Sequence, residues 1–80
     1  MLRSNITVYP NPSQNGIFYL RGIPAQAKLT ILDPVGKLLM VRNEIAANIN
    51  IDLSSFGPGA YFVNITSNGQ DVNFRVVVIE

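Results

Sequence analysis

Five carboxylates are the first candidates for acid–base or metal chemistry in the 80-residue sequence: Asp33, Glu44, Asp52, Asp71 and Glu80. The sequence has no His and no Cys, so it lacks the commonest general base and every thiolate ligand. Hydrolysis by a carboxylate pair requires two facing groups in a cleft, and calcium requires about six to eight oxygen ligands. No D-x-D-x-D cluster is present. The sequence therefore predicts a protein that is not an enzyme and needs no metal or cofactor.

Individual polar residues offer two weaker candidates for chemistry, a serine nucleophile and a surface calcium site. Ser54 and Ser55 have no His to activate them, which excludes a nucleophilic triad. Three aspartates are each expected at a strand end, where a surface calcium site is the less favoured interpretation: Asp33, Asp52 and Asp71. Turn initiation and hydrogen bonding at strand ends are the favoured roles for these side chains.

Composition narrows the class of protein further. Hydrophobic residues make up 48% of the sequence and charged residues 14%, which excludes intrinsic disorder. The formal net charge of +1 provides no electrostatic attraction for nucleic acid or anionic lipid. No apolar run has the length of a transmembrane helix or follows Arg3 as in a signal peptide. These features favour a small binding or structural module.

The apolar residues alternate with period two, which favours strands. Turn residues separate seven such segments, and only residues 43–47 resemble a helix, too short to form alone. The strands are expected at residues 6–9, 17–21, 27–32, 37–42, 48–53, 60–66 and 71–79. This pattern predicts an all-β fold, a seven-stranded immunoglobulin-like antiparallel β-sandwich. We expect one domain over residues 6–80, preceded by residues 1–5 as a linker or an expression-derived N-terminus.

Local motifs assign structural roles within this sandwich. Residues 33–36 have the Asp, Pro and Gly positions of a type I turn, and Asn68-Gly69 forms the tip of a hairpin. Tyr61 follows a Gly57-Pro58-Gly59 corner at the start of a strand. That position predicts a tyrosine corner, in which the hydroxyl donates back to the corner's backbone.

The last strand departs from the alternation. Val77 and Ile79 point opposite to the core residues Phe74, Val76 and Val78. Either neighbouring structure covers both faces, or a partner uses the strand by strand addition or groove binding. Residues 37–41 are also apolar on both faces of the expected strand, and they are a candidate for covering the last strand.

Several motifs in sequence order resemble the C-terminal sorting domains of the type IX secretion system of Gram-negative bacteria, the type A sorting domain family. These motifs are residues 8–12 with Asn15-Gly16, residues 29–33 with Gly36-Lys37, residues 51–56 with 59–63, and residues 72–79. The resemblance covers residues 6–80. One departure is Glu80, which stands where many members end in a basic residue.

The resemblance implies that the domain directs an attached cargo protein across the outer membrane. The translocon would recognise it and a sortase-like peptidase would remove it, during passage from the periplasm to the cell surface or extracellular space. It implies partner contacts at Arg75, Val76, Val77, Val78, Ile79 and Glu80. It also implies a structural role, in maintaining the fold that presents these contacts, for Tyr9, Pro10, Asn11, Pro12, Gly16, Asp33, Gly36, Lys37, Asp52, Gly59 and Tyr61.

Two other classes of function stay open at this stage. A carbohydrate-binding or adhesive module would expose aromatic side chains on one sheet face, and the candidates are Tyr9, Tyr19 and Phe62. A structural spacer between domains would have chain continuing beyond Glu80.

Overall fold

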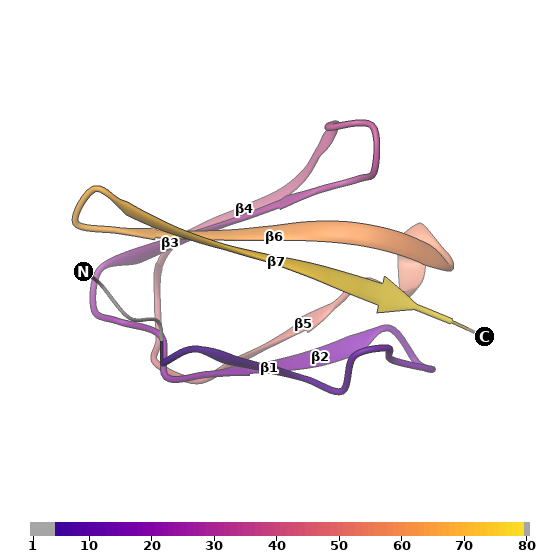
Figure 1. The fold of residues 1–80 in the computed structure, drawn as a ribbon, viewed down its shortest axis with the longest axis horizontal. Coiled ribbons are helices and arrows are strands. Elements are labelled where there is room, and N and C mark those ends of the chain that lie inside the picture. The colour runs from indigo at the N-terminus through magenta and orange to yellow at the C-terminus, as the bar shows by residue number, and fades with distance from the viewer. Residues whose placement is uncertain (1–4, 80) are drawn as a thin grey trace.

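The computed structural model describes residues 5–79, and within them seven strands form two antiparallel sheets. The three-stranded sheet has the order β1-β2-β5 and the four-stranded sheet the order β4-β3-β6-β7. Figure 1 shows the two sheets as facing layers. The elements are β1 (Thr7–Tyr9), β2 (Ile17–Arg21), β3 (Ala27–Leu32), β4 (Leu38–Ile45), β5 (Ile49–Asp52), the short 3₁₀-helix η1 (Ser54–Phe56), β6 (Gly59–Ser67) and β7 (Gln70–Val78). The expected seven-stranded immunoglobulin-like β-sandwich is confirmed.

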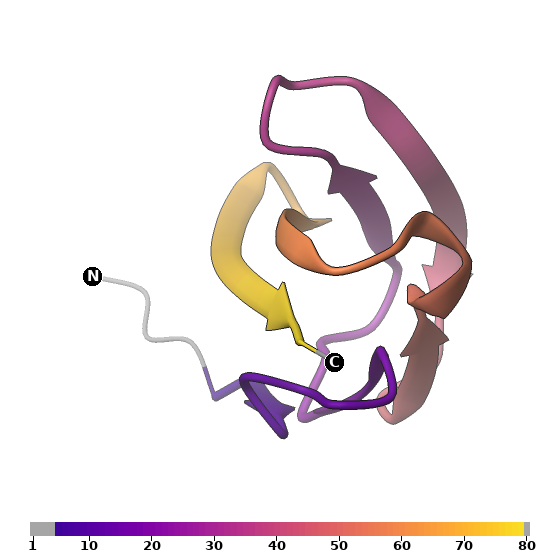
Figure 2. The ribbon, with the colours of Figure 1, turned by 90° about the vertical axis from the view of Figure 1, so that its right-hand side faces the viewer.

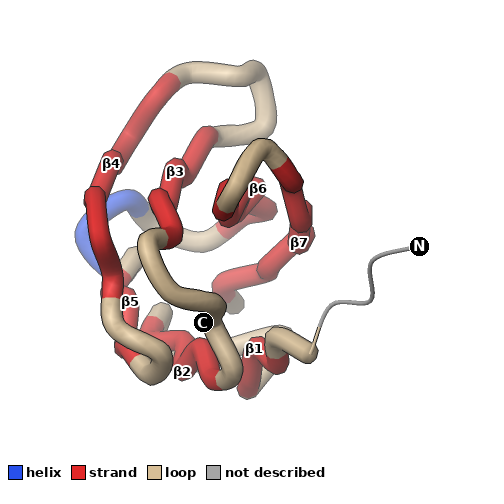
Figure 3. The backbone as a smooth tube through the Cα atoms, turned by 90° about the vertical axis from the view of Figure 1, so that its left-hand side faces the viewer, coloured by secondary structure: helices blue, strands red, loops and turns tan. Residues whose placement is uncertain are grey.

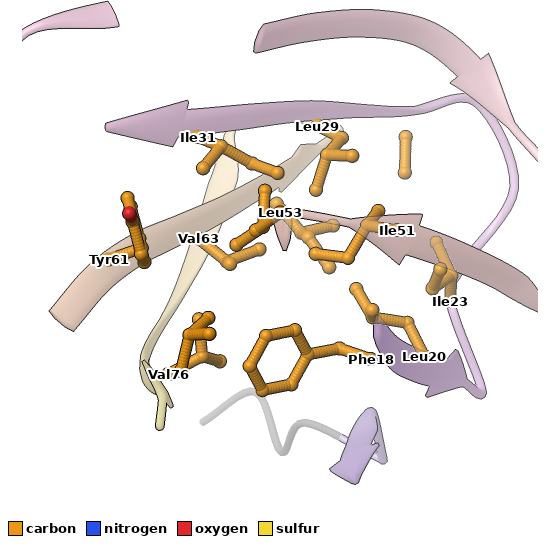
Figure 4. Packing of buried hydrophobic residues seen from close by; sticks show 13 residues of the cluster. Phe18, Leu20, Ile23, Leu29, Ile31, Ile51, Leu53, Tyr61, Val63 and Val76 are labelled. Carbon is orange, nitrogen blue, oxygen red and sulfur yellow. The ribbon is translucent and has the colours of Figure 1, made fainter. Parts of the chain in front are cut away.

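The alternation in the sequence places one face of most strands in the core. Phe18 and Leu20 of β2 point toward Leu29 and Ile31 of β3, as Figure 4 shows. Because successive side chains of a strand face opposite sides, the residues between them face solvent. The buried cluster comprises Phe18, Leu20, Ile23, Ala27, Leu29, Ile31, Ile51, Leu53, Tyr61, Val63, Ile65, Val76 and Val78.

Strand β4 is longer than the sequence pattern indicated. It continues to Ile45 and so includes residues 43–45, the segment that resembled a helix. Two register shifts interrupt its pairing with β3, and Glu44 has a φ of 50°. Such bulges break the period-two pattern, which is why the alternation ended at residue 42.

The apolar run of β4 does not cover the last strand. Strands β4 and β7 lie at opposite edges of the four-stranded sheet, with β3 and β6 between them. Figure 3 shows the same separation from the left-hand side of Figure 1. Cover of β7 by residues 37–41 is therefore excluded.

The corner before β6 has the geometry of a tyrosine corner. The Tyr61 hydroxyl donates to the Gly57 carbonyl oxygen at 2.6 Å, and the ring is buried. The Phe56 ring lies 6.4 Å from the Tyr61 ring, measured between centroids. This contact and the hydrogen bond tie η1 to the start of β6.

Gly16 allows the β1–β2 connection to pass close to η1. Its φ is 79°, and a Cβ at this position would lie 2.8 Å from the backbone N and Cα of Ser54. The Gly16 carbonyl accepts a hydrogen bond from the Leu53 N–H at 2.8 Å. Only a residue without a side chain satisfies both the conformation and the distance.

Replacing Gly16 with Ala should destabilise the fold more than the same change at Gly36. Gly36 also has a positive φ, 89°, but open space surrounds its missing Cβ. We expect Gly36→Ala to cost about 1–2 kcal/mol from backbone conformation and Gly16→Ala at least about 1 kcal/mol more from overpacking. Urea unfolding of both variants measures the difference. Equal losses would contradict the close approach to Ser54.

Asp52 links β5 to η1 through its carboxylate. The Ser54 hydroxyl and the Ser54 N–H, at 2.9 Å from Oδ1, donate to it and lower the pKa of Asp52 below its ordinary value. A carboxyl whose pKa is lower in the folded state stabilises the fold when it is ionised, so its contribution is fully present above the unfolded-state pKa of about 3.9. That contribution is lost as pH falls through the folded-state pKa.

The stability difference between the unmodified protein and Asp52→Asn should therefore depend on pH. We expect the variant to be the less stable at neutral pH and the gap to close as pH falls through the lowered folded-state pKa of Asp52, because both side chains are then uncharged. Urea unfolding across this pH range measures the gap. A gap that is constant with pH would contradict the role of the charge.

Candidate functional site

The candidate site is the second half of β7 together with the loop that follows β1. Strand β7 pairs with β6 along one edge and is the outer strand of its sheet. Figure 2 shows the end of β7 close to the connection between β1 and β2. The free edge of β7 therefore meets a segment more than 60 residues earlier in the chain.

Four hydrogen bonds from this loop close the second half of the free edge. The Asn11 side chain donates from Nδ2 to the Arg75 carbonyl at 2.9 Å and accepts at Oδ1 from the Val77 N–H at 3.0 Å. The Ser13 N–H then donates to the Val77 carbonyl at 2.8 Å, and the Ser13 carbonyl accepts from the Ile79 N–H at 2.9 Å. The Asn11 amide thus imitates one residue of a neighbouring strand.

The side chain of Ser13 fixes the loop from the inside. It is fully buried, and its hydroxyl is 2.9 Å from both Asn15 Oδ1 and the Ile17 carbonyl. Pro10 and Pro12 flank Asn11, and neither has an N–H that would need a partner. The sequence motif indicated Asn11 and both prolines, but Ser13 was missed. Its signal was a small hydroxyl residue between the proline pair and Asn15-Gly16.

The partner-contact residues expected from the sequence divide into two sets. Val76 and Val78 are 0% and 5% exposed and belong to the core. Arg75 is exposed, Val77 is half-buried, and Ile79 is 39% exposed. Glu80 lies outside the described residues. Within residues 75–79, only the second set offers side chains to a partner.

The half-buried side chain of Val77 belongs to an apolar stripe on the outer face of the four-stranded sheet. Paired residues of neighbouring strands share a face, and Val77 pairs with Ala60. Phe62 pairs with Leu32, which pairs in turn with Leu38. Phe62 and Leu38 are exposed. The stripe thus crosses the sheet from β7 to β4.

The exposed side chain of Ile79 lies at a separate hollow. Its lining comprises Pro10, Pro12, Gln14, Asn15 and Ile79, and its volume is about 500 Å³. The loop that closes the edge of β7 therefore also forms a concave surface beside the end of the strand.

The three aromatic residues considered for an adhesive surface do not share one face. Tyr9 and Tyr19 pair on the three-stranded sheet, with ring centroids 5.6 Å apart. The Arg21 guanidinium lies 5.9 Å and 5.5 Å from these two ring centroids. Phe62 lies on the other sheet. The arginine covers the tyrosine pair, an arrangement typical of cross-strand packing.

The remaining motif residues lie in the turn between β3 and β4 and at the start of β6. The Asp33 carboxylate accepts from the N–H groups of Val35 and Lys37, at 3.0 Å and 2.8 Å, and Gly36 donates to the Asp33 carbonyl. Gly59, with a φ of 145°, begins β6. Across residues 5–79 no three side chains of His, Cys, Asp or Glu come together as a metal site. The same residues include no helix long and apolar enough to cross a membrane.

The comparisons with known proteins identify the family. The model of the secretion system C-terminal sorting domain matches residues 7–80, so the chain belongs to that family. A solved structure of PorZ, described as an essential bacterial surface component of the type IX secretion system of Porphyromonas gingivalis, has a similar fold, with a TM-score of 0.80. The two sequences are 21% identical over 95% of this chain, which spans 12% of the PorZ chain. No curated protein sequence matches the chain.

Replacing Asn11 with Ala should weaken the closure of the β7 edge. The Arg75 carbonyl and the Val77 N–H would then depend on water, so we expect a loss of about 1–2 kcal/mol in the free energy of unfolding. Asn43→Ala on β4 is the control, because this exposed side chain has no hydrogen bond to another described residue. Urea unfolding measures both. Equal losses would mean that the Asn11 amide does not stabilise β7.

Proposed function

We propose that this domain is a sorting signal that the outer-membrane translocon of the type IX secretion system recognises at the end of β7. Membership of the sorting-domain family implies attachment to a cargo protein and export to the cell surface or extracellular space. The observation that supports the position is that Arg75 and Ile79 are exposed and Val77 is half-buried, next to the core residues Val76 and Val78. The proposed contact thus uses side chains that the fold holds in fixed positions.

Recognition at this end of β7 depends on side chains and not on strand addition. The outward N–H and C=O groups from the Arg75 carbonyl to the Ile79 N–H already bond to Asn11 and Ser13. A partner strand could pair there only by displacing the loop. The apolar stripe at Val77 and the hollow at Ile79 are accessible without any such rearrangement.

The proposed function includes the route of the cargo and the removal of the domain. The cargo crosses the periplasm, the translocon recognises residues 75–80, and residues 6–80 act as one folded unit. A sortase-like peptidase then removes the domain by cutting near or before Ser4. The domain is its substrate and has no catalytic role of its own.

An export assay tests this function. Residues 1–80 are fused to the C-terminus of a periplasmic reporter in a host with a working type IX system. Deleting residues 75–80 would remove Val76 and Val78 from the core, so substitutions at exposed positions are preferable. The variant Arg75→Ala/Val77→Thr/Ile79→Ser should stay folded and lose export to the level of the reporter without the domain.

The matched control changes similar side chains at the other edge of the same sheet. Val41→Thr/Arg42→Ala alters exposed positions of β4 outside the apolar stripe and should leave export unchanged. Periplasmic retention of the unmodified fusion would contradict the sorting function. Normal export of the β7 variant would contradict only the proposed position of the contact.

A further inference from the structure

Asn11 and Ser13 bond only to the second half of the β7 edge, and the first half remains open. In an antiparallel strand, the N–H and C=O of alternate residues point to the same side. The bonds of residues 75, 77 and 79 to the loop therefore place the groups of Asp71 and Asn73 on the free edge as well. Among residues 5–79, no group bonds to the backbone N–H and C=O of Asp71 and Asn73 or to the N–H of Arg75.

The charged side chains along this open edge are complementary to those of a second copy in antiparallel orientation. Asp71 and Arg75 have opposite charges and stand two residues to either side of Asn73. We propose that two copies of this chain pair antiparallel through these edges, with Asn73 of one copy opposite Asn73 of the other. This register places each Asp71 opposite Arg75 of the second copy. Opposite charges directly across an antiparallel pair are attractive.

The inner face of the same pairing is apolar. Val72 and Phe74 are half-buried and point toward the core side of the sheet. In the register centred on Asn73, each Val72 lies opposite Phe74 of the second copy, so the pairing covers more of both. The Arg75 carbonyl, which accepts from Asn11, has a second lone pair for the Asp71 N–H of the second copy.

Registers centred on Asp71 or Arg75 are disfavoured, and registers centred on Val72 or Phe74 place a charged residue opposite Asn73 and lack the attraction between opposite charges. Moving the centre to Asp71 brings two carboxylates together. Moving it to Arg75 brings two guanidinium groups together and places the second strand against Asn11, which already occupies that edge. The open segment ends at the Asn68-Gly69 turn on one side and at Asn11 on the other. Its length therefore matches one antiparallel pair centred on Asn73.

Charge reversal in the isolated domain tests this dimer. The paired segment is short, so we expect weak association, with a Kd of about 0.1–1 mM. Sedimentation equilibrium and NMR diffusion across a concentration series measure it. Asp71→Arg and Arg75→Asp should each weaken association about tenfold or more, because each creates two like-charge pairs. The double variant Asp71→Arg/Arg75→Asp should restore it, since both pairs are then attractive again.

Charge-matched controls on β4 separate pairing from changes of net charge. Glu44→Arg and Arg42→Asp alter exposed residues away from β7 and should leave the Kd unchanged. A monomer at every concentration would overturn the proposal. A double variant as weak as the single variants would also overturn it, because only pairing of the edge with itself predicts rescue. These outcomes are independent of the export assay, which reports on the function.

Discussion

The hydrogen bonds between the Asn11 side chain and β7 protect the second half of a long edge strand. A sandwich of two open sheets leaves edge strands with unpaired N–H and C=O groups. Strand β4 is interrupted by two register shifts, and β1 is only three residues long before Pro10. Strand β7 is long and regular, and an asparagine and a serine from the β1–β2 loop close its second half.

This closure links the position of the proposed partner contact to the fold. The side chains of Val76 and Val78 pack in the core. The loop bonds to the edge of β7 that does not pair with β6. The backbone from the Arg75 carbonyl to the Ile79 N–H is consequently held by the loop on the side of β7 away from β6. The proposed recognition of the folded domain would benefit from this order, because a mobile end would lose conformational entropy on binding.

Most of the fold could be predicted from the sequence, because period-two patterns and turn residues act locally. The hairpin at Asn68-Gly69 and the buried positions of β2, β3 and β6 follow from such patterns. The extension of β4 could not be predicted, because bulges remove the alternation. For the site, the motif around Asn11 indicated a structural role but not its partner. The contact between Asn11 and β7 spans 64 residues, and no local pattern encodes a pairing at that separation. Burial of Val76 and Val78 followed from alternation, whereas the outer-face neighbours of Val77 required the strand order.

Residue-resolved amide hydrogen exchange in the unmodified, dilute protein tests the central claim most directly. We expect slow exchange at Val77 and Ile79, whose N–H groups bond to the loop, and fast exchange at Asn73 and Arg75 on the open half of the same edge. Fast exchange at Val77 and Ile79 would contradict the closure by Asn11 and Ser13. Equal protection along the whole strand would contradict the division of the edge.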